Sequence, residues 1–155
     1  MGEMLNKWLK MKREPPVIEE AILNISVTSS LVKDKLERVC QKFGITAAQY
    51  NVMRILKGVY PEGHPRCEIF TRMIERAPDI TRLIDRLEKL ELVERDRTDD
   101  DRRKSITRIT KKGINLLNKL IPLMDEKIKE FGKKLTEKEA KAMSNYCEKL
   151  YADLI

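Results

Sequence analysis

The chain has 155 residues, of which 37 % are charged and only 5 % are aromatic, with six glycines and six prolines. This composition favours a mainly helical domain over a β-sandwich or a barrel, and the length suits one structural domain. No apolar run is long enough to cross a bilayer, and the N-terminus lacks the apolar core of a signal peptide. We therefore expect a cytoplasmic protein that makes no membrane contact.

The first part of the chain is predicted to form an arm and a long helix. Residues 1–16 carry an apolar stripe and end at Pro15–Pro16, which fits either a short docking helix or a frayed arm. From Val17 to Phe43, apolar residues recur at alternating steps of four and three, the spacing with which one helix packs against another. Ser29 is the polar member of this seam.

A second helix is predicted to follow Gly44, a residue type that commonly ends helices. Thr46–Ala–Ala–Gln49 has the pattern of a capping box, in which the two polar side chains bond to backbone N–H groups at the start of a helix. This helix breaks at residues 58–65, and Arg66–Cys67–Glu68 could then be a minimal strand.

The stretch from Glu68 to Thr110 is predicted to form a short helix, a turn, a second helix and a β-hairpin. In the second helix, four apolar residues recur on one helical face and predict a buried side: Ile80, Leu83, Ile84 and Leu87. The polar residues of this helix are predicted to point outward: Asp79, Thr81, Arg82, Asp85 and Arg86.

The hairpin consists of residues 92–95 and 105–109, in which apolar and polar residues alternate as in half-buried strands. Residues 96–104 between them are too polar to be packed inside a protein. A helix that presents threonine and arginine beside a hairpin with an arginine-rich loop is typical of a winged helix-turn-helix. In that fold the helix enters the major groove of DNA, and the loop can reach the minor groove.

Charge alone leaves two interpretations of this central stretch open. Residues 66–110 hold 12 Lys and Arg against 11 Asp and Glu, so the stretch is nearly neutral and could be a solvated face of mixed charge. However, ten of the chain's 13 arginines lie there. Arginine makes planar, bidentate contacts with phosphate and guanine, so this concentration favours a recognition surface.

The C-terminal part is predicted to contain two more amphipathic helices. The first follows Thr110 and carries Pro122 as a predicted kink, and the second begins at the capping box Thr136–Glu139. We assign residues 1–44 to an arm and a dimerisation helix, 45–110 to a winged helix-turn-helix lobe, and 111–155 to C-terminal dimerisation helices. The fold class is therefore mainly α with a small β-wing, in one structural domain that forms a homodimer.

Neither a metal site nor a cofactor is expected. Cys40, Cys67 and Cys147 are isolated, and His64 is the only histidine. The sequence has no glycine-rich phosphate loop and no nucleophile with a histidine base, so we do not expect an enzyme.

The sequence resembles the MarR family of bacterial winged-helix regulators from about residue 17 to the end. The resemblance is carried by residues 79–95, by Asp101–Arg102–Arg103, and by Ile109–Thr110–Lys–Lys–Gly113, which keep the order and spacing of that family. It implies a dimer that reads a pseudo-palindromic operator in double-stranded DNA. It also implies, for many relatives, a repressor that a small aromatic or anionic effector releases from DNA.

Carried over by position, the resemblance implies two groups of DNA-binding residues. The recognition helix supplies Asp79, Thr81, Arg82 and Arg86. The wing supplies Arg97, Arg102, Arg103 and Lys104, with Arg103 in the minor groove and Asp101 orienting it. An effector pocket between the first long helix and the lobe could be bordered by Ser29, Tyr50, Met53 and Arg54, although Tyr and Met at helical spacing are more often core residues.

Three departures from the family pattern are visible. Arg76–Ala77 stand where relatives commonly have Ser or Thr before the recognition helix, so the capping role is expected to pass to Asp79. The wing holds three consecutive acids, Asp99 to Asp101, which should weaken nonspecific DNA binding. They leave an alternative function open, namely a helical module whose winged unit docks a partner protein. Cys40 lies at the far end of its helix, away from the position of the reactive cysteine in oxidant-sensing relatives.

Overall fold

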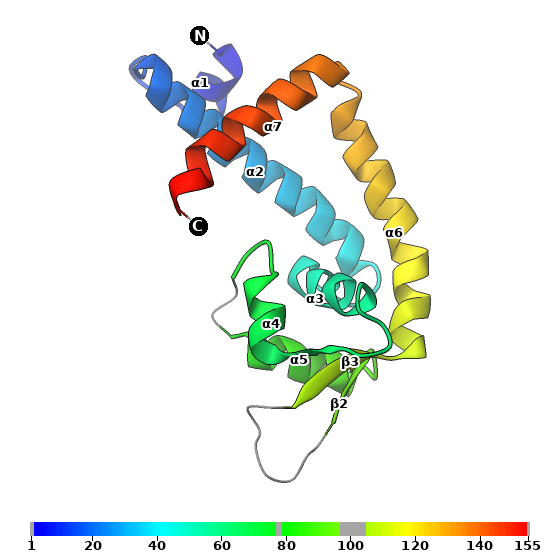
Figure 1. The fold of residues 1–155 in the computed structure, drawn as a ribbon. Coiled ribbons are helices and arrows are strands. Elements are labelled where there is room, and N and C mark those ends of the chain that lie inside the picture. The colour runs from blue at the N-terminus through cyan, green and yellow to red at the C-terminus, as the bar shows by residue number, and fades with distance from the viewer. Residues whose placement is uncertain (1, 77–78, 97–104, 155) are drawn as a thin grey trace.

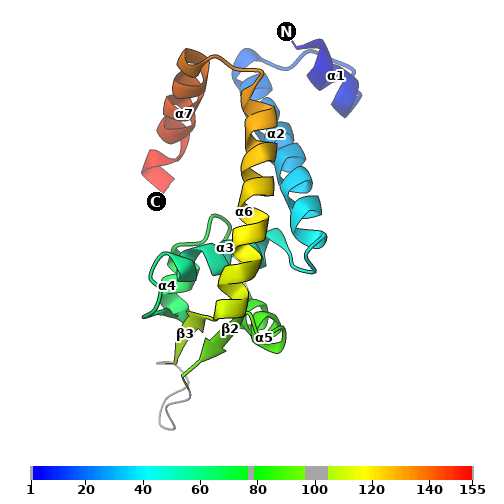
Figure 2. The ribbon, with the colours of Figure 1, turned by 90° about the vertical axis from the view of Figure 1, so that its right-hand side faces the viewer.

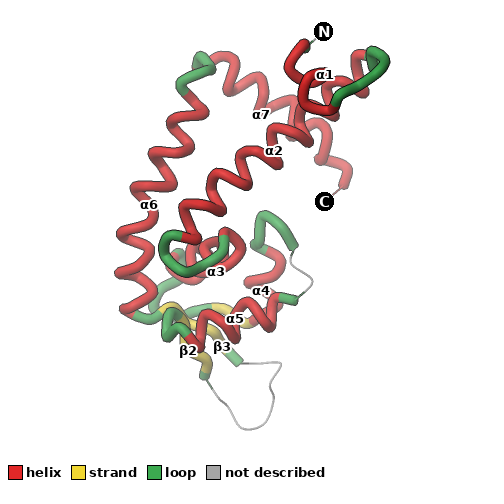
Figure 3. Tube along the Cα trace, turned by 180° about the vertical axis from the view of Figure 1, so that it is seen from behind, coloured by secondary structure: helices red, strands yellow, loops and turns green. Residues whose placement is uncertain are grey.

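The computed structural model describes residues 2–76, 79–96 and 105–154 (Figure 1). Helices make up most of the described chain, and the strands are confined to one end of the molecule (Figure 3). The predicted mainly helical fold with a small sheet is confirmed. In chain order the elements are α1 (Glu3–Leu9), α2 (Val17–Gln41), α3 (Ala47–Lys57), β1 (His64–Pro65), α4 (Arg66–Thr71), α5 (Ile80–Lys89), β2 (Val93–Arg95), β3 (Ile106–Ile109), α6 (Lys111–Gly132), α7 (Glu137–Tyr151) and the 3₁₀ helix η1 (Ala152–Leu154).

The lobe is built from α3, α4, α5 and a three-stranded antiparallel sheet with the strand order β1-β3-β2. Val93 lies opposite Ile109 in the β2–β3 pair, and both side chains are buried in the core. The predicted apolar face of α5 supplies Ile80, Ile84 and Leu87 to the same core. The alternation in the hairpin and the periodicity of the helix therefore describe two surfaces that pack against each other.

The third strand is present, but the prediction that it comprises Arg66 to Glu68 is wrong. The strand is His64–Pro65, which pairs with Thr107 and Ile106, and α4 begins immediately at Arg66. Gly63 explains the position of the strand. Its φ is +80°, and a Cβ there would lie 2.3 Å from the carbonyl oxygen of Thr107. Only glycine lets the chain approach β3 this closely in that conformation.

The helix caps predicted from the sequence are present. Thr46 and Thr136 each form a complete capping box, with Gln49 and Glu139 respectively. Thr110 caps α6, which continues as one helix through Pro122. These caps satisfy N–H groups that the first turn of a helix leaves without partners, and they fix where each helix begins.

The long helices α2 and α6 pack against each other near the lobe and diverge toward the far end of the molecule, where α1 and α7 lie (Figures 1 and 3). Near the lobe both are buried, through Val39 and Cys40 of α2 and through Leu117 and Leu120 of α6. At the far end apolar side chains are exposed in the single chain. Figure 2 shows α7 held away from α2, and none of its residues is buried. Among the described residues, no helix combines the length and the apolar character needed to cross a membrane.

Candidate nucleic-acid interface

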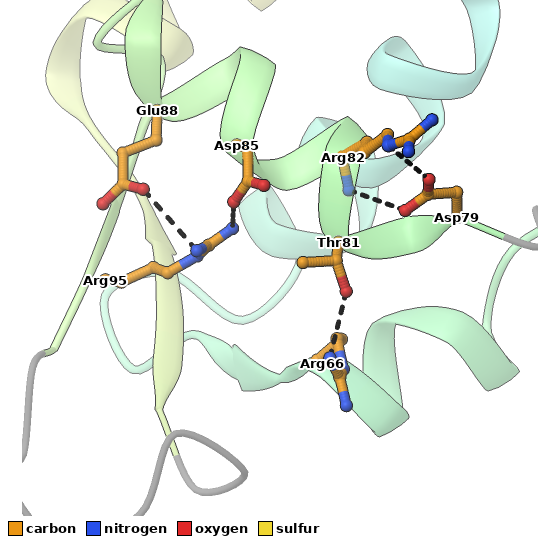
Figure 4. Close-up of polar contacts among 7 residues, drawn as sticks. All are labelled: Arg66, Asp79, Thr81, Arg82, Asp85, Glu88 and Arg95. Carbon is orange, nitrogen blue, oxygen red and sulfur yellow. Dashed lines mark hydrogen bonds and ion pairs between the residues drawn. The ribbon is translucent and has the colours of Figure 1, made fainter.

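The recognition helix α5 begins at Asp79, whose carboxylate makes two contacts with Arg82 (Figure 4). Asp79 Oδ1 accepts a hydrogen bond from the backbone N–H of Arg82 at 3.1 Å, and Oδ2 lies 2.8 Å from Arg82 Nε. Asp79 is therefore the N-cap, as the absence of Ser or Thr before this helix indicated. Both carboxylate oxygens thus have partners within this helix, and the predicted contact of Asp79 with DNA stays a prediction.

Two arginines of α5 are exposed to solvent. The Arg82 side chain is 78 % exposed even though it is paired with Asp79. Arg86 is also exposed, and within the described part of the chain it makes no ion pair. Because the opposite face of α5 is buried in the core, these guanidinium groups can point only outward, where a ligand outside the lobe can reach them.

Arg66 is a residue of this surface that the sequence analysis missed. It is the first residue of α4, and its Nη1 donates to Thr81 Oγ1 at 3.0 Å (Figure 4). Thr81, predicted on the recognition helix, is therefore hydrogen-bonded to a neighbouring helix. The concentration of arginine in residues 66–110 is the signal that points to Arg66, although the sequence predicts a strand at this residue.

Arg95 connects the hairpin to the recognition helix. From β2, its Nη2 lies 2.5 Å from Asp85 Oδ1, and its Nη1 lies 3.7 Å from Glu88 Oε2 (Figure 4). The Arg95 side chain is only 23 % exposed. The prediction that Asp85 simply points outward is therefore incomplete, because its carboxylate is bonded to the strand. Arg108 of β3 and Asp96, the residue that follows β2, form another ion pair within the hairpin.

The wing residues predicted to contact DNA lie outside the described residues. These are Arg97, Arg102, Arg103 and Lys104, together with Asp101. The strands on either side of them are described, and Arg95 of β2 lies opposite Thr107 of β3. Their predicted roles stay predictions.

A cavity of about 620 Å³ lies between α2, the start of α3 and the turn that follows α4. Of the four residues predicted to border a pocket, only Ser29 lines this cavity. Met53 is fully buried in the core, and Tyr50 packs against that core. Arg54 Nη1 donates to the Tyr50 hydroxyl one helical turn away. These three residues do not line this cavity, and the positions of Tyr50 and Met53 fit the core alternative.

Comparisons with known proteins agree with this geometry. A family model described as transcriptional regulator SarA/Rot matches residues 34–120. The HTH-type transcriptional regulator MhqR of Bacillus subtilis (strain 168) is 31 % identical over 109 residues, which cover 70 % of this chain and 73 % of MhqR.

Two solved structures have the same fold. A MarR transcription factor from Planctomyces limnophilus is 33 % identical and has a TM-score of 0.69, with 88 % of this chain and 98 % of that chain covered. Staphylococcus aureus MepR, solved as a complex with DNA, is 22 % identical and has a TM-score of 0.73, with 86 % and 95 % covered. The family and the fold are those of transcription regulators.

Proposed function

This chain belongs to the SarA/Rot group of MarR-like winged-helix transcriptional regulators, and we propose that it is a homodimeric repressor that binds operator DNA. The observation that carries the proposal is the exposed pair Arg82 and Arg86 on a helix whose other face is fixed in the core. Arginines on such a helix can make bidentate contacts with base edges in the major groove. Because an operator lies on the chromosome, a protein with this function acts in the cytoplasm.

The hairpin supports the same function. Arg95 bonds to Asp85 and comes within 4 Å of Glu88, so the strand and the recognition helix are held in one orientation. The loop between β2 and β3 contains Arg97, Arg102, Arg103 and Lys104. We propose that, when α5 lies in the major groove, this loop reaches along the duplex and Arg103 enters the minor groove, with Asp101 orienting it.

The far end of the molecule supports a homodimer. Large apolar side chains are exposed there in the single chain, among them Trp8 of α1, Ile18 of α2 and Tyr146 of α7. A second copy that covers these side chains would place two recognition helices on one duplex, as a pseudo-palindromic operator requires. In this arrangement residues 1–44 and 111–155 form the dimerisation region, and residues 45–110 form the DNA-binding lobe.

The cavity beside α2 supports control by a small molecule. It lies where the dimerisation helix meets the turn that leads to α5. A ligand bound there contacts both parts and can change how the lobe is held, so we propose that an effector releases the protein from DNA. The alternative function, a winged unit that docks a partner protein, rests on the acids Asp99 to Asp101, and the family of the chain does not favour it.

The test is the recovery and sequencing of genomic DNA fragments bound by the purified protein at physiological salt. The Arg82→Ala/Arg103→Ala double variant serves as the control, after circular dichroism and sedimentation show that it is folded like the wild type. We expect enrichment of a pseudo-palindromic sequence that the double variant does not enrich. Equal recovery of fragments by both proteins would contradict the assigned interface and favour the protein-docking alternative.

A further inference from the structure

The cavity beside α2 has an apolar wall and a charged rim. Val32 and Leu36 of α2 and Met73 of the turn after α4 supply apolar surface. The charged residues that line it are Lys33, Glu37 and Glu75. With a volume of about 620 Å³, the cavity has room for a molecule with two or three fused rings. Its shape and lining therefore suit an amphipathic small molecule.

The charges of this rim do not favour an anion. Lys33 is the only cation among the described residues that line the cavity, and its Nζ already lies 2.6 Å from Glu75 Oε2. Glu37 Oε2 accepts the backbone N–H of Ala47 at 2.6 Å, which fixes a second carboxylate at the start of α3. An anionic ligand would have to displace Glu75 from Lys33 and would still lie near Glu37.

The environment of Lys33 shows the same excess of negative charge. The hydrogen bond to Glu75 and the charge of Glu75 raise the pKa of Lys33, burial opposes this rise, and the carboxylates of Asp34 and Glu37 add to it. Lys33 and Glu75 are both more than half exposed, so an ion pair between them contributes little and is easily exchanged. A competing cation can take the place of Lys33, whose long side chain can move into water.

We propose that this cavity binds an organic cation, with an amine or similar group on Glu75 and an aromatic or aliphatic body against Val32, Leu36 and Met73. This inference rests on the proposed control of the protein by an effector, and it assigns that effector a charge opposite to the one implied by the family resemblance. Attraction by two carboxylates and burial of the apolar body act together.

Binding at Glu75 would also explain release from DNA. The turn after α4 is held by two polar links, the Lys33–Glu75 pair and a hydrogen bond of 2.9 Å from the Ile74 N–H to Asn51 Oδ1. The same turn leads toward Asp79 and α5. A cation on Glu75 removes the link to α2, so the turn that leads toward the recognition helix is held to the dimerisation helix less tightly.

The first experiment compares three probes that share one ring system: 2-naphthylmethylamine, 2-naphthalenemethanol and 2-naphthoate. Each is titrated at pH 7 into the full-length protein without DNA, and the methionine methyl signals are followed by NMR. Met73 lines the cavity, whereas the exposed Met4 and Met143 report on the far end of the molecule. We expect the Met73 signal to shift and the amine to bind about tenfold more tightly than the carboxylate.

A matched pair of variants tests the role of Glu75. Glu75→Gln should lower the affinity for the amine by about fivefold and leave the affinity for the neutral alcohol unchanged, because only an ion pair is lost. Glu62→Gln, at an exposed glutamate outside the cavity lining, should change neither affinity. Equal or tighter binding of the carboxylate, no binding of any probe, or an amine affinity unaffected by Glu75→Gln would overturn the proposal.

DNA binding is measured separately, by fluorescence anisotropy with a recovered operator. The amine should lower the operator affinity of the wild type and have less effect on the Glu75→Gln variant. A protein that binds the amine at Met73 but binds no DNA would contradict the proposed function and leave the cation site standing. A protein that binds operator but prefers the carboxylate would contradict only the cation site.

Discussion

At the scale of the residue, Arg82 has the geometry of a side chain that exchanges one partner for another. In the free protein its Nε is paired with Asp79, yet most of its side chain is exposed. An exposed pair of this kind is weak, so a guanine edge or a phosphate can replace the carboxylate at little cost. The same aspartate caps the helix and therefore stays in place when the arginine moves.

We predict that Arg82→Ala lowers operator affinity by about 1–3 kcal/mol and relaxes sequence specificity, because a bidentate base contact is lost. Arg82→Lys should restore only part of this loss, since lysine lacks the planar fork of arginine. Fluorescence anisotropy with the operator and with single-base variants measures both effects. Arg54→Ala, at an exposed arginine of α3, is the control. Unchanged affinity of Arg82→Ala would exclude Arg82 from the interface.

Cys40 shows what burial does to a reactive group. Its side chain is fully buried, and burial together with the charge of Glu37 raises its pKa from 9.0 to about 11. The thiolate is the reactive form, so a thiol that stays protonated at neutral pH reacts slowly. Cys67, in contrast, is exposed.

We predict that iodoacetamide at pH 8 modifies Cys67 in the folded protein and spares Cys40, whereas both react in urea. Mass spectrometry of peptides measures the two rates. The pKa of Cys40 is higher in the folded protein than in the unfolded chain. The contribution of Cys40 to the free energy of unfolding is therefore fully present below pH 9 and is lost as the pH rises from 9 to 11. Urea unfolding of the wild type and Cys40→Ala at pH 8 and 10.5 should show this difference. Rapid labelling of Cys40 in the folded protein would contradict the prediction.

At the scale of the element, Arg95 adds polar contacts between the recognition helix and the hairpin, which also pack against each other in the core. The β2 strand is only three residues long and the β1 strand only two, so the sheet by itself offers few bonds to set the direction of the wing. A half-buried guanidinium between Asp85 and Glu88 adds directional contacts that a short strand lacks. Arg95 is therefore expected to position the wing without touching DNA.

We predict that Asp85→Asn and Arg95→Gln each weaken operator binding. The loss of binding free energy in the double variant should be smaller than the sum of the two single losses, with a coupling energy of about 0.5–3 kcal/mol. The salt dependence of binding separates positioning from contact. If Arg95 neutralised a phosphate, the Arg95→Gln variant would lose about one unit of salt slope. An unchanged slope supports positioning, and a reduced slope would show a direct contact with the DNA backbone.

At the scale of the whole molecule, the two ends differ in how well their apolar side chains are buried within the single chain. The lobe has a closed core, to which α3, α5, the sheet and the parts of α2 and α6 nearest the lobe contribute. At the far end, α7 buries nothing in the single chain, and its apolar residues Met143, Tyr146 and Leu150 are at least half exposed. An amphipathic helix of this kind is stable in water when a second surface covers it.

We predict that Tyr146→Glu/Leu150→Lys converts a dimer into monomers and abolishes tight operator binding while the lobe stays folded. The lobe is unaffected because neither residue contributes to its core. Light scattering after size-exclusion chromatography measures the mass, and anisotropy measures DNA binding. Lys138→Gln on the polar face of α7 is the control. A double variant that remains dimeric would place the dimer interface elsewhere.

Features that depend on neighbours within about one helical turn or one strand could be predicted from the residues alone. The spacing of Ile80, Ile84 and Leu87 predicts the buried face of α5, and the capping boxes at Thr46 and Thr136 predict where two helices begin. Such patterns are readable because helices and strands repeat with fixed periods and their ends require particular residue types. The family motif extended this prediction from the fold to the function.

Contacts between residues far apart in the sequence follow from how the elements pack. Arg95 bonds to Asp85 across ten positions, Arg66 bonds to Thr81 across 15, and Lys33 bonds to Glu75 across 42. No local period relates such pairs, because their contact depends on how α2, α4, α5 and the hairpin pack. For this reason the sequence predicted a pocket at Ser29, Tyr50, Met53 and Arg54, of which Ser29 lines the cavity, and it did not indicate that Lys33 and Glu75 meet there.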